Sequence, residues 1–221
     1  KKDLIMYMAH DLKTPLTSVI GYLSLLNEEK EISKELQEKY IKIALNKSLR
    51  LEELTNQFFE ITRYNLKDMP ITRTKIDLVM LMEQLVEEFY PMLEERHLKL
   101  KVAKPDFLMY SADGDKLARA FGNLLRNAIS YSYENTTIKI EMFENENDVK
   151  IIFENEGATI PEYKLEKIFD KFYRGDEARQ TNNGGTGLGL AITKEIVELH
   201  NGTINATSSN ETIKFEIILK K

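Results

Sequence analysis

Apolar residues recur at steps of three and four along the first 67 residues, and this spacing predicts two long amphipathic helices. The first is expected from about residue 4 to residue 27, and the charged segment 28–34 forms the turn before the second. The apolar stripe of the first helix consists of Ile5, Met8, Leu12, Leu16, Val19, Leu23 and Leu26. The stripe of the second consists of Leu36, Tyr40, Ile43, Ala44, Leu51, Leu54, Phe58 and Ile61. One hairpin cannot cover both stripes, so we expect two copies to associate as a dimeric four-helix bundle.

The pattern changes beyond residue 68. Alternation of apolar and polar residues predicts strands at 98–102, 137–143, 149–153 and 213–219. Helical periodicity returns at 116–131 and 188–200. Mixed strands and helices indicate an α/β sandwich, in which helices cover one face of a sheet. The expected fold class is therefore α+β, with a helical-hairpin domain at residues 1–67 and an α/β-sandwich domain at residues 68–221.

Composition narrows the possible partners. The net charge is −5, with many charges of both signs, so nucleic acid is not expected as a partner. The chain has no cysteine, which excludes disulfides and thiolate metal sites. No apolar run approaches the roughly 20 residues needed to cross a bilayer, and the chain begins with Lys1. We therefore expect the soluble part of a longer protein.

One histidine lies away from the apolar stripe of the first helix. At about 100° per residue, His10 is almost diametrically opposite the stripe, and Thr14 lies one turn further on the same face. A solvated surface histidine is the ordinary explanation. The alternative is a nucleophile that a second molecule can reach. Pro15 removes one backbone donor inside this helix and predicts a kink just past His10.

Two segments of the second domain suit a phosphate-bearing ligand. Asn123 and Asn127 lie four residues apart on the polar flank of helix 116–131, where two amide oxygens can face a hard cation such as Mg²⁺. The glycine-rich segment 184–189 runs into a helix, so its backbone N–H groups can approach an anion closely. It lacks the Gly-Lys-Ser/Thr ending of a P-loop and the spacing of a dinucleotide fingerprint. Paired surface asparagines and a flexible turn are the ordinary explanations.

A third polar region lies between these two. Residues 155–161 follow a predicted strand as a turn, and a short helix is expected before residues 168–174. The segment 175–185 is expected to act as a lid over a ligand. Lys171 and Arg174 precede this segment and are placed to reach the terminal phosphate of a nucleotide. Ordinary surface charge explains each of them when taken alone.

The order of these segments resembles the sensor histidine kinases of two-component systems, over essentially the whole chain. Five boxes of that family occur in the family's order: the phosphoacceptor box at 8–16, the asparagine box at 123–127, the first glycine box at 155–161, the phenylalanine box at 169–174 and the second glycine box at 185–189. Within the family, residues 17–26 and 58–64 resemble the vancomycin-resistance sensor kinases.

This resemblance implies roles for individual residues. His10 would accept the γ-phosphoryl group of ATP, Asp11 would act as the general base, and Thr14 would serve a phosphatase activity. Arg174 and Lys171 would offset negative charge in the transition state. Asn123 and Asn127 would also bind Mg²⁺. The residues implied to bind ATP are Asn123, Asn127, Tyr131, Asn155, Gly157, Gly185, Gly187, Leu188 and Gly189.

The resemblance also implies a fold and partners. The second domain would be an ATPase domain of the histidine kinase and Hsp90-like (GHKL) type. The hairpin would form a homodimer, and the phosphoryl group would pass to an aspartate in the receiver domain of a response regulator. The chain would be the cytoplasmic portion of a membrane sensor, whose membrane segment precedes this sequence. The narrower resemblance implies control of glycopeptide antibiotic resistance.

Three positions depart from the family's pattern. Asn155 stands where the family usually has an aspartate that accepts from the adenine amino group, Thr159 replaces a glycine, and Ser130 replaces a basic residue. A neutral amide accepts a weaker hydrogen bond than a carboxylate, so we expect weakened ATP binding. Two alternatives therefore stay open: another GHKL-type ATPase, which would not need His10, and a non-catalytic dimerisation and nucleotide-binding module.

Overall fold

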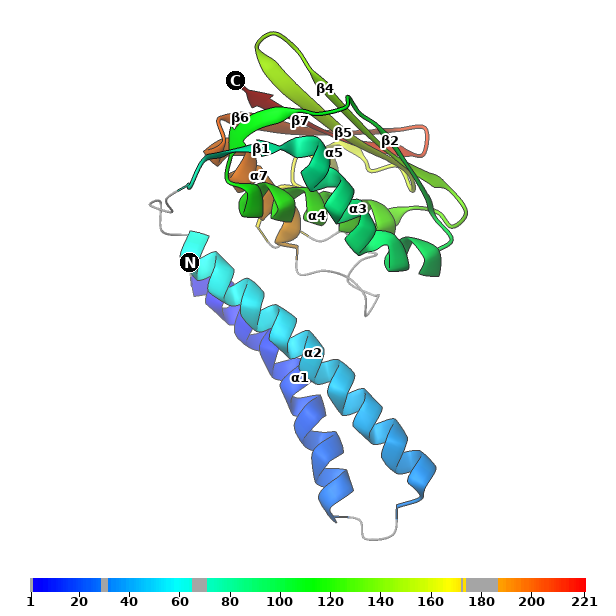
Figure 1. Cartoon of the computed structure of the whole chain (residues 1–221). Helices are drawn as coiled ribbons and strands as arrows, with labels where there is room; N and C mark the ends of the chain where they lie inside the picture. Colours follow the sequence, from blue (N-terminus) through cyan, green and yellow to red (C-terminus); the bar gives the residue numbers. More distant parts are fainter. Residues whose placement is uncertain (1, 29–31, 65–70, 172, 174–186) are drawn as a thin grey trace. The chain divides into compact units, whose positions relative to one another are not determined.

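The computed structural model of this chain describes residues 2–28, 32–64, 71–171, 173 and 187–221. Within these ranges, side chains are described from residue 12 onwards, apart from 53 and 56–64. The chain divides into two compact units, residues 1–69 and 70–221 (Figure 1), and each is treated by itself. None of the helices in the described ranges is both long and apolar enough to cross a membrane.

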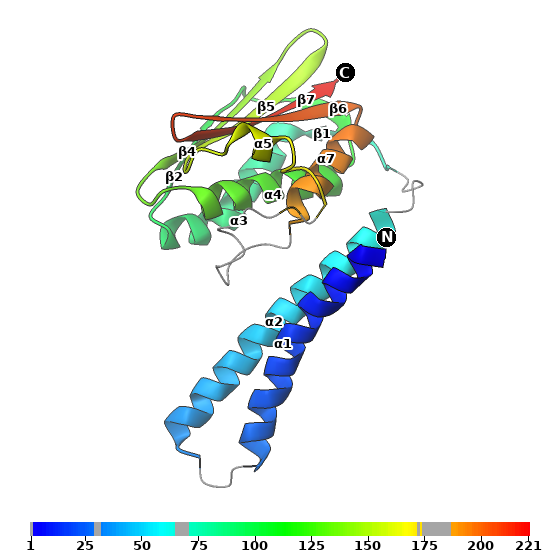
Figure 2. The same ribbon diagram turned by 180° about the vertical axis from the view of Figure 1, so that it is seen from behind.

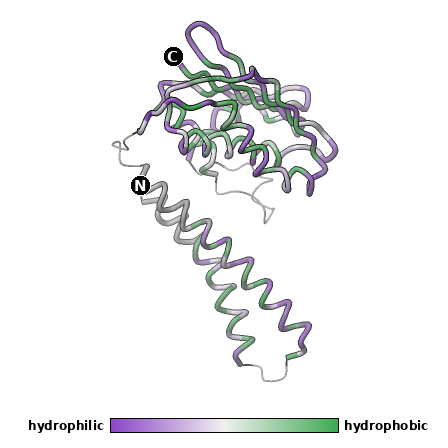
Figure 3. The backbone as a smooth tube through the Cα atoms, in the orientation of Figure 1, coloured by the Kyte–Doolittle hydropathy of each residue, from purple (hydrophilic) through white to green (hydrophobic). Residues whose placement is uncertain are grey.

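The first unit is a hairpin of two long helices, α1 (Lys2–Glu28) and α2 (Lys34–Tyr64), which confirms the predicted helical hairpin. Hydrophilic and hydrophobic stretches alternate along the coloured part of both helices (Figure 3). The rings of Tyr22 and Tyr40 pack across the hairpin with their centroids 5.4 Å apart. Helix α1 continues through Pro15, which is buried.

The hairpin leaves much of its apolar surface uncovered. Leu16 and Leu23, two members of the predicted stripe of α1, are exposed, while Leu12, Val19 and Leu26 are only partly buried. The large exposed apolar side chains of the hairpin are Leu16, Ile20, Leu23 and Leu25 in α1 and Ile41, Leu45 and Leu49 in α2. Apolar rows on both helices therefore lack a covering layer within this unit.

The second unit is built on a five-stranded sheet with the strand order β2-β4-β5-β7-β6. The bounds of its strands are β2 (Lys99–Ala103), β4 (Thr137–Glu144), β5 (Asp148–Glu156), β6 (Gly202–Ser209) and β7 (Thr212–Lys220). Strands β2 and β4 are parallel, and the other neighbouring pairs are antiparallel. A separate two-stranded antiparallel sheet pairs β1 (Thr74–Asp77) with β3 (Met109–Ala112).

Three helices cover one face of the large sheet, as both ribbon views show (Figures 1 and 2). They are α3 (Leu78–Glu95), α4 (Gly114–Tyr131) and α7 (Gly189–Leu199), and a short helix, α5 (Glu162–Leu165), follows β5. Phe121 of α4 packs against Phe153 of β5, with ring centroids 6.1 Å apart. Side chains along each strand point alternately to the two faces of the sheet, so charged residues occupy the face that the helices do not cover. On that face, Lys139 Nζ lies 2.9 Å from Glu154 Oε1. This arrangement confirms the predicted α/β sandwich.

Side chains at the starts of the helices explain why they begin where they do. Asp77 accepts a hydrogen bond from the Val79 N–H at 3.0 Å and so caps α3. Asp113 caps α4 in the same way through the Lys116 N–H at 3.2 Å. Burial opposes ionisation of the Asp113 carboxyl, but hydrogen bonds from Lys116 and from the Thr72 N–H outweigh it and lower its pKa.

Several predicted boundaries were wrong, and four elements were not predicted. Strand β2 begins one residue later than expected, because the Leu98 N–H donates to the Leu93 carbonyl and closes the end of α3. Strand β5 extends to Glu156, beyond the expected end at Phe153, because its ladder with β7 continues. Helix α4 starts two residues early because its cap is Asp113. The elements without a sequence prediction are β1, α3, β3 and β6.

Candidate active site

Helix α4 brings two groups of predicted site residues together, one around the start of α7 and one at the end of β5. In the first group, the Asn123 Nδ2 donates to the Gly189 carbonyl at 3.1 Å. The Oγ1 of Thr193, which is buried in α7, donates to the same carbonyl at 2.9 Å. A Cβ on Gly189 would lie 3.6 Å from the Asn123 side chain, so helix and glycine turn are in direct contact.

Asn127 lies one turn further along α4 and is partly buried. Within the described part of the chain, its side chain makes no hydrogen bond, so both of its polar atoms are available to a ligand. The described residues also hold no cluster of three histidine, cysteine, aspartate or glutamate side chains that could bind a metal. A divalent cation here would therefore depend on amide oxygens and on oxygens of the ligand.

The second group joins the last residue of α4 to the turn after β5. Gly157 lies so close to the Tyr131 carbonyl oxygen that any Cβ there would clash with it. The turn is also held by hydrogen bonds from Gly157 N–H to the Glu211 carbonyl at 2.8 Å and from Tyr133 N–H to the Glu156 carbonyl at 2.9 Å. The side chain of Tyr131 itself is half exposed.

Asn155 lies beside this turn and is almost completely buried, with 3% of its surface exposed. Its Nδ2 has no hydrogen-bond partner among the described residues. A Cβ placed on Gly157 would be 3.4 Å from that nitrogen. Buried polar atoms are rarely left without a partner. The unpartnered Asn155 Nδ2, next to the close contact between Gly157 and the Tyr131 carbonyl, therefore marks a position where a ligand can bind.

The glycine-rich segment is described only from residue 187 onwards. Gly187 has a φ of 73°, a backbone conformation that favours glycine. Leu188 is buried at 2% exposure, and Gly189 begins α7. Gly185, like Arg174 and the predicted lid at 175–185, lies outside the described residues.

Lys171 contacts α7 through a charged side chain. Its Nζ lies 3.9 Å from Glu195 Oε2, and both side chains are partly exposed. Nearby, the Lys194 ammonium lies 5.9 Å from the centre of the Phe169 ring, which packs edge-on against Phe215 of β7 at 6.3 Å. These contacts place Lys171 beside the helix that follows the glycine turn.

The predicted nucleophile lies on α1 in the first unit. The structure places His10 and Asp11 within this helix, but their side chains are outside the described set. Thr14 is exposed, and its carbonyl accepts a hydrogen bond from the Ser18 Oγ at 3.2 Å.

Two contacts at this site were missed by the sequence reasoning. Thr193 lies in the predicted helix 188–200 but was not identified as a site residue, although its spacing of four from Gly189 was a usable signal. Thr159, noted only as a lost glycine, accepts a hydrogen bond from the Glu211 N–H at 2.9 Å. Its hydroxyl ties the loop after β5 to the turn between β6 and β7.

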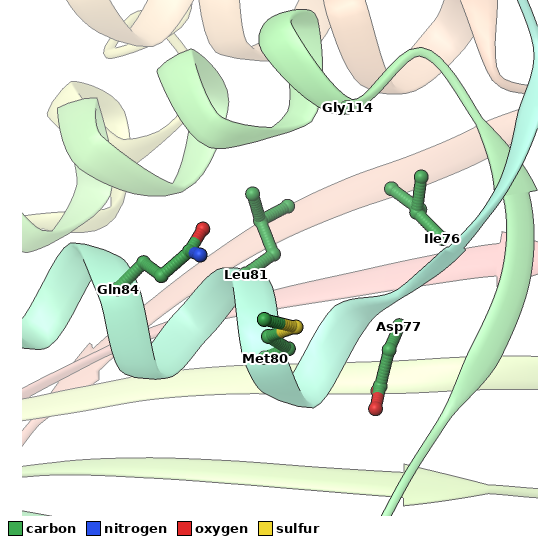
Figure 4. A pocket seen from close by; sticks show the side chains of 6 residues that line it. All are labelled: Ile76, Asp77, Met80, Leu81, Gln84 and Gly114. Atoms are coloured by element: carbon green, nitrogen blue, oxygen red, sulfur yellow. The ribbon is translucent and has the colours of Figure 1, made fainter.

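A hollow of about 280 Å³ lies elsewhere in the second unit, between β1, the first turns of α3 and the start of α4 (Figure 4). Its lining residues are Ile76, Asp77, Met80, Leu81, Gln84 and Gly114. It contains none of the predicted nucleotide-binding residues, so it is a separate feature from the site described above.

Buried titratable groups lie at the far end of α7. His200 is fully buried, and its Nε2 accepts from the Asp113 N–H at 3.0 Å. Its Nδ1 must therefore carry the proton that is donated to the Ile196 carbonyl at 2.8 Å. Burial lowers the pKa of His200, which keeps the ring neutral. His200 therefore has a structural role at the end of α7.

Comparison with known families divides the chain in the same way. Residues 1–66 match the His Kinase A (phospho-acceptor) domain. Residues 112–221 match the family described as histidine kinase-, DNA gyrase B- and HSP90-like ATPases.

Similar proteins extend the match over the whole chain. The sensor protein VanS of Enterococcus faecium is 48% identical over 99% of this chain and 57% of its own length. The sensor protein VanSC of Enterococcus gallinarum is 47% identical over 100% of this chain and 61% of its own length. The chain thus spans less than two thirds of either relative.

A solved structure matches across both units. It is the histidine kinase ThkA in complex with the response regulator protein TrrA, with a TM-score of 0.79 and 25% identity. The match covers 99% of this chain and 61% of that one.

Proposed function

Because the chain belongs to the sensor histidine kinases of two-component systems, we propose that it phosphorylates itself on His10 with ATP and passes the group to a response regulator. One observation carries this proposal: a phospho-acceptor domain that contains His10 and an ATPase domain occur on the same chain. The complex of ThkA with a response regulator supports the choice of partner.

The residues present fit a nucleotide. The orphan Asn155 Nδ2, the closeness of Gly157 to Tyr131 and the left-handed backbone at Gly187 all favour a bound ligand at the glycine turns. Backbone N–H groups at Gly185, Gly187, Leu188 and Gly189 would bind phosphates, and Tyr131 would stack on the base.

The residues present also fit a magnesium ion, which would bind the side-chain amide oxygens of Asn127 and Asn123. The Asn127 amide has no partner among the described residues, and the Asn123 Nδ2 is bonded to Gly189, which leaves its Oδ1 to face a cation. When bound, Mg²⁺ supplies positive charge that stabilises the phosphates as they react. Asn123 would in addition fix the glycine turn.

The transfer itself follows from the chemistry of the side chains. At an ordinary pKa near 6.5, about three quarters of histidines are neutral at pH 7 and can act as nucleophiles. A nitrogen of His10 forms a bond to the γ-phosphorus, the bond to the ADP oxygen breaks, and Asp11 accepts the proton from the other ring nitrogen. Arg174 and Lys171 would offset the charge on the transferred group.

We also propose a phosphatase activity towards the phosphorylated regulator. Thr14 lies one turn beyond His10 on α1 and is exposed. Its hydroxyl would orient the water that hydrolyses the aspartyl phosphate.

The exposed apolar rows of the hairpin support a homodimer in which two hairpins form a four-helix bundle. Similarity to VanS and VanSC supports a role in the control of glycopeptide antibiotic resistance.

Labelling with γ-labelled ATP and Mg²⁺ tests the kinase proposal. We expect acid-labile, base-stable label on the unaltered chain and none on His10→Gln. The exposed histidine variant His97→Asn is the matched control and should label normally. ATP hydrolysis that His10→Gln leaves unchanged would instead favour another GHKL-type ATPase, and absence of both label and hydrolysis would favour a non-catalytic module.

A further inference from the structure

The side chain of Asn155 has a fixed position but a free donor. It lies near the end of β5, opposite Ile213 of β7 in the strand ladder, and it is 3% exposed. On β5, Asn155 is on the same face as Phe153, which packs against Phe121 of α4. Its amide thus lies between sheet and helices, and its Nδ2 has no partner among the described residues.

Hydrogen bonds and close packing hold the backbone at Asn155 and at the two residues that follow it. The ladder with β7 holds the residue itself, and the next residue, Glu156, accepts a hydrogen bond from Tyr133. Gly157 is held by Glu211 and lies against the Tyr131 carbonyl. The amide is therefore fixed in place, but it can still present either of its two ends by a half turn about the bond that joins it to Cβ.

An amide and a carboxylate differ at such a position. The amide carries one acceptor oxygen and one donor nitrogen of nearly equal size, whereas an ionised carboxylate only accepts. Purines also differ in whether position 6 carries a donor or an acceptor: adenine has a 6-amino donor, and guanine has a 6-oxo acceptor. A carboxylate facing the 6-oxo group would bring two acceptors together, but an amide can turn its nitrogen towards it.

We propose that Asn155 gives this site dual specificity for 6-amino and 6-oxo purines, so that inosine and guanosine triphosphates serve as phosphoryl donors beside ATP. This inference rests on the proposed function, because it takes Asn155 as the residue that faces the base. With adenine, Oδ1 accepts from the 6-amino group and Nδ2 donates to N1. With a 6-oxo purine, Nδ2 donates to the oxygen and Oδ1 accepts from the N1–H.

Inosine triphosphate isolates this contact. Its base differs from adenine only in the 6-oxo group and the N1 proton, whereas guanine also carries a 2-amino group, which takes no part in the proposed contact with Asn155. The experiment is titration calorimetry of the full chain with the magnesium complexes of ATP, ITP and GTP, repeated for Asn155→Asp. Asn147→Asp makes the same change at an exposed position in the turn before β5 and is the matched control.

For the unaltered chain, we expect ATP and ITP affinities within about tenfold of each other, the difference that a single neutral hydrogen bond makes. Asn155→Asp should raise the ratio of ATP to ITP affinity by about tenfold or more, because a charged acceptor favours the 6-amino group and repels the 6-oxo group. Asn147→Asp should leave the ratio unchanged. We expect γ-labelled ITP and GTP to label the unaltered chain, and His10→Gln to abolish that label.

Three results would overturn the inference. The unaltered chain could bind ATP but reject ITP by more than about a hundredfold, or a folded Asn155→Asp could keep the original ratio. If Asn155→Asp fails to fold, as judged by its melting curve, labelling of the unaltered chain by ATP but not by ITP would decide against the inference. Each of these outcomes leaves ATP binding and the proposed function intact, whereas failure to bind any of the three nucleotides would reject both.

Discussion

The two units of this chain differ in how completely they cover their own apolar residues. In residues 70–221, side chains as large as Phe121 and Phe153 are almost fully buried between the sheet and its helices. In the hairpin, Leu45 and Leu49 are more than half exposed, and the buried members among its described aliphatic residues are Pro15, Ala44 and Leu54. The second unit can therefore stabilise itself, whereas the hairpin depends on a partner surface.

The chemistry is divided along the same line. The proposed nucleophile lies on the hairpin, whereas the residues proposed to bind the nucleotide lie on the self-sufficient unit. Dimerisation and nucleotide binding should consequently respond to different substitutions, and this separation is open to direct test.

The largest expected effect comes from placing a charge in the exposed row of α2. Leu45→Glu should weaken the homodimer by at least about 3 kcal/mol, since each dimer loses two leucines whose burial stabilises it by about 1.5 kcal/mol or more. That corresponds to more than a hundredfold in the dissociation constant. Sedimentation velocity over a concentration series measures it. Asn46→Glu adds the same charge at the adjacent exposed polar position, and equal weakening by both variants would contradict the proposed interface.

A glycine in each unit gives the next comparison. Gly157→Ala should destabilise the second unit by about 2 kcal/mol, because its Cβ would meet the Tyr131 carbonyl in a turn held on both sides. Gly21→Ala should stabilise the hairpin by about 1 kcal/mol, because this helical position has nothing within 4 Å. Urea unfolding monitored by hydrogen exchange measures the free energy of unfolding of each unit separately. A destabilising Gly21→Ala would mean that the dimer packs tightly at this glycine.

The second unit should also respond to pH through His200. Its pKa is lowered by burial, so the unfolded chain binds the proton more readily than the folded chain does. The associated stability is complete above about pH 6.5 and is lost as the pH falls towards the lowered value, by at most about 1.4 kcal/mol per pH unit. Arg73 and Lys116 disfavour the charged ring, whereas Asp113 favours it.

Hydrogen exchange of the β7 amides between pH 7.5 and 5 measures this dependence. The exposed His97 serves as the control, because His97→Asn keeps a residue that tolerates its φ of 53° and should leave the profile unchanged. A profile of the unaltered chain that stays flat down to pH 5 would contradict the role of His200.

The elements that the sequence predicted are those with a strong period. The hairpin helices carry long apolar stripes, and β4 and β7 alternate because one face of the sheet is buried. In β5 the alternation is interrupted by Ile151, Ile152 and Phe153, which are all buried, but the apolar run itself still indicates a strand. Strand β6 reads Gly-Thr-Ile-Asn-Ala-Thr-Ser-Ser and has little apolar signal, since it is an edge strand held mainly by its ladder with β7. Helix α3 also carries an apolar face, with Leu78, Met82, Leu85, Phe89 and Leu93 at helical spacing, so its period was a usable signal that the sequence reasoning overlooked. Pro91 lies inside it without ending it.

The same limit applies to the site. The sequence identified Asn155 as a departure from the family's pattern, but its orphan nitrogen depends on how β5, α4 and the turn at Gly157 meet. Asn123 and Asn127 looked equivalent by spacing. Only the packing of α7 against α4 distinguishes them, since Gly189 and Thr193 come from a segment 66 to 70 residues away in sequence.

The smallest expected effects come from Asn123 and Asn127, and they test which of the two side chains supports the fold and which binds the ligand. Asn123→Ala removes the bond to the Gly189 carbonyl and should lower the stability of the second unit by about 1 kcal/mol. Asn127→Ala removes a side chain without a partner among the described residues, so stability should stay within about 0.5 kcal/mol of the original. It should nevertheless weaken ATP binding in the presence of Mg²⁺ more than in its absence. Urea unfolding and nucleotide titration with and without Mg²⁺ measure both effects, and equal destabilisation by the two variants would show that Asn127 supports the fold rather than the ligand.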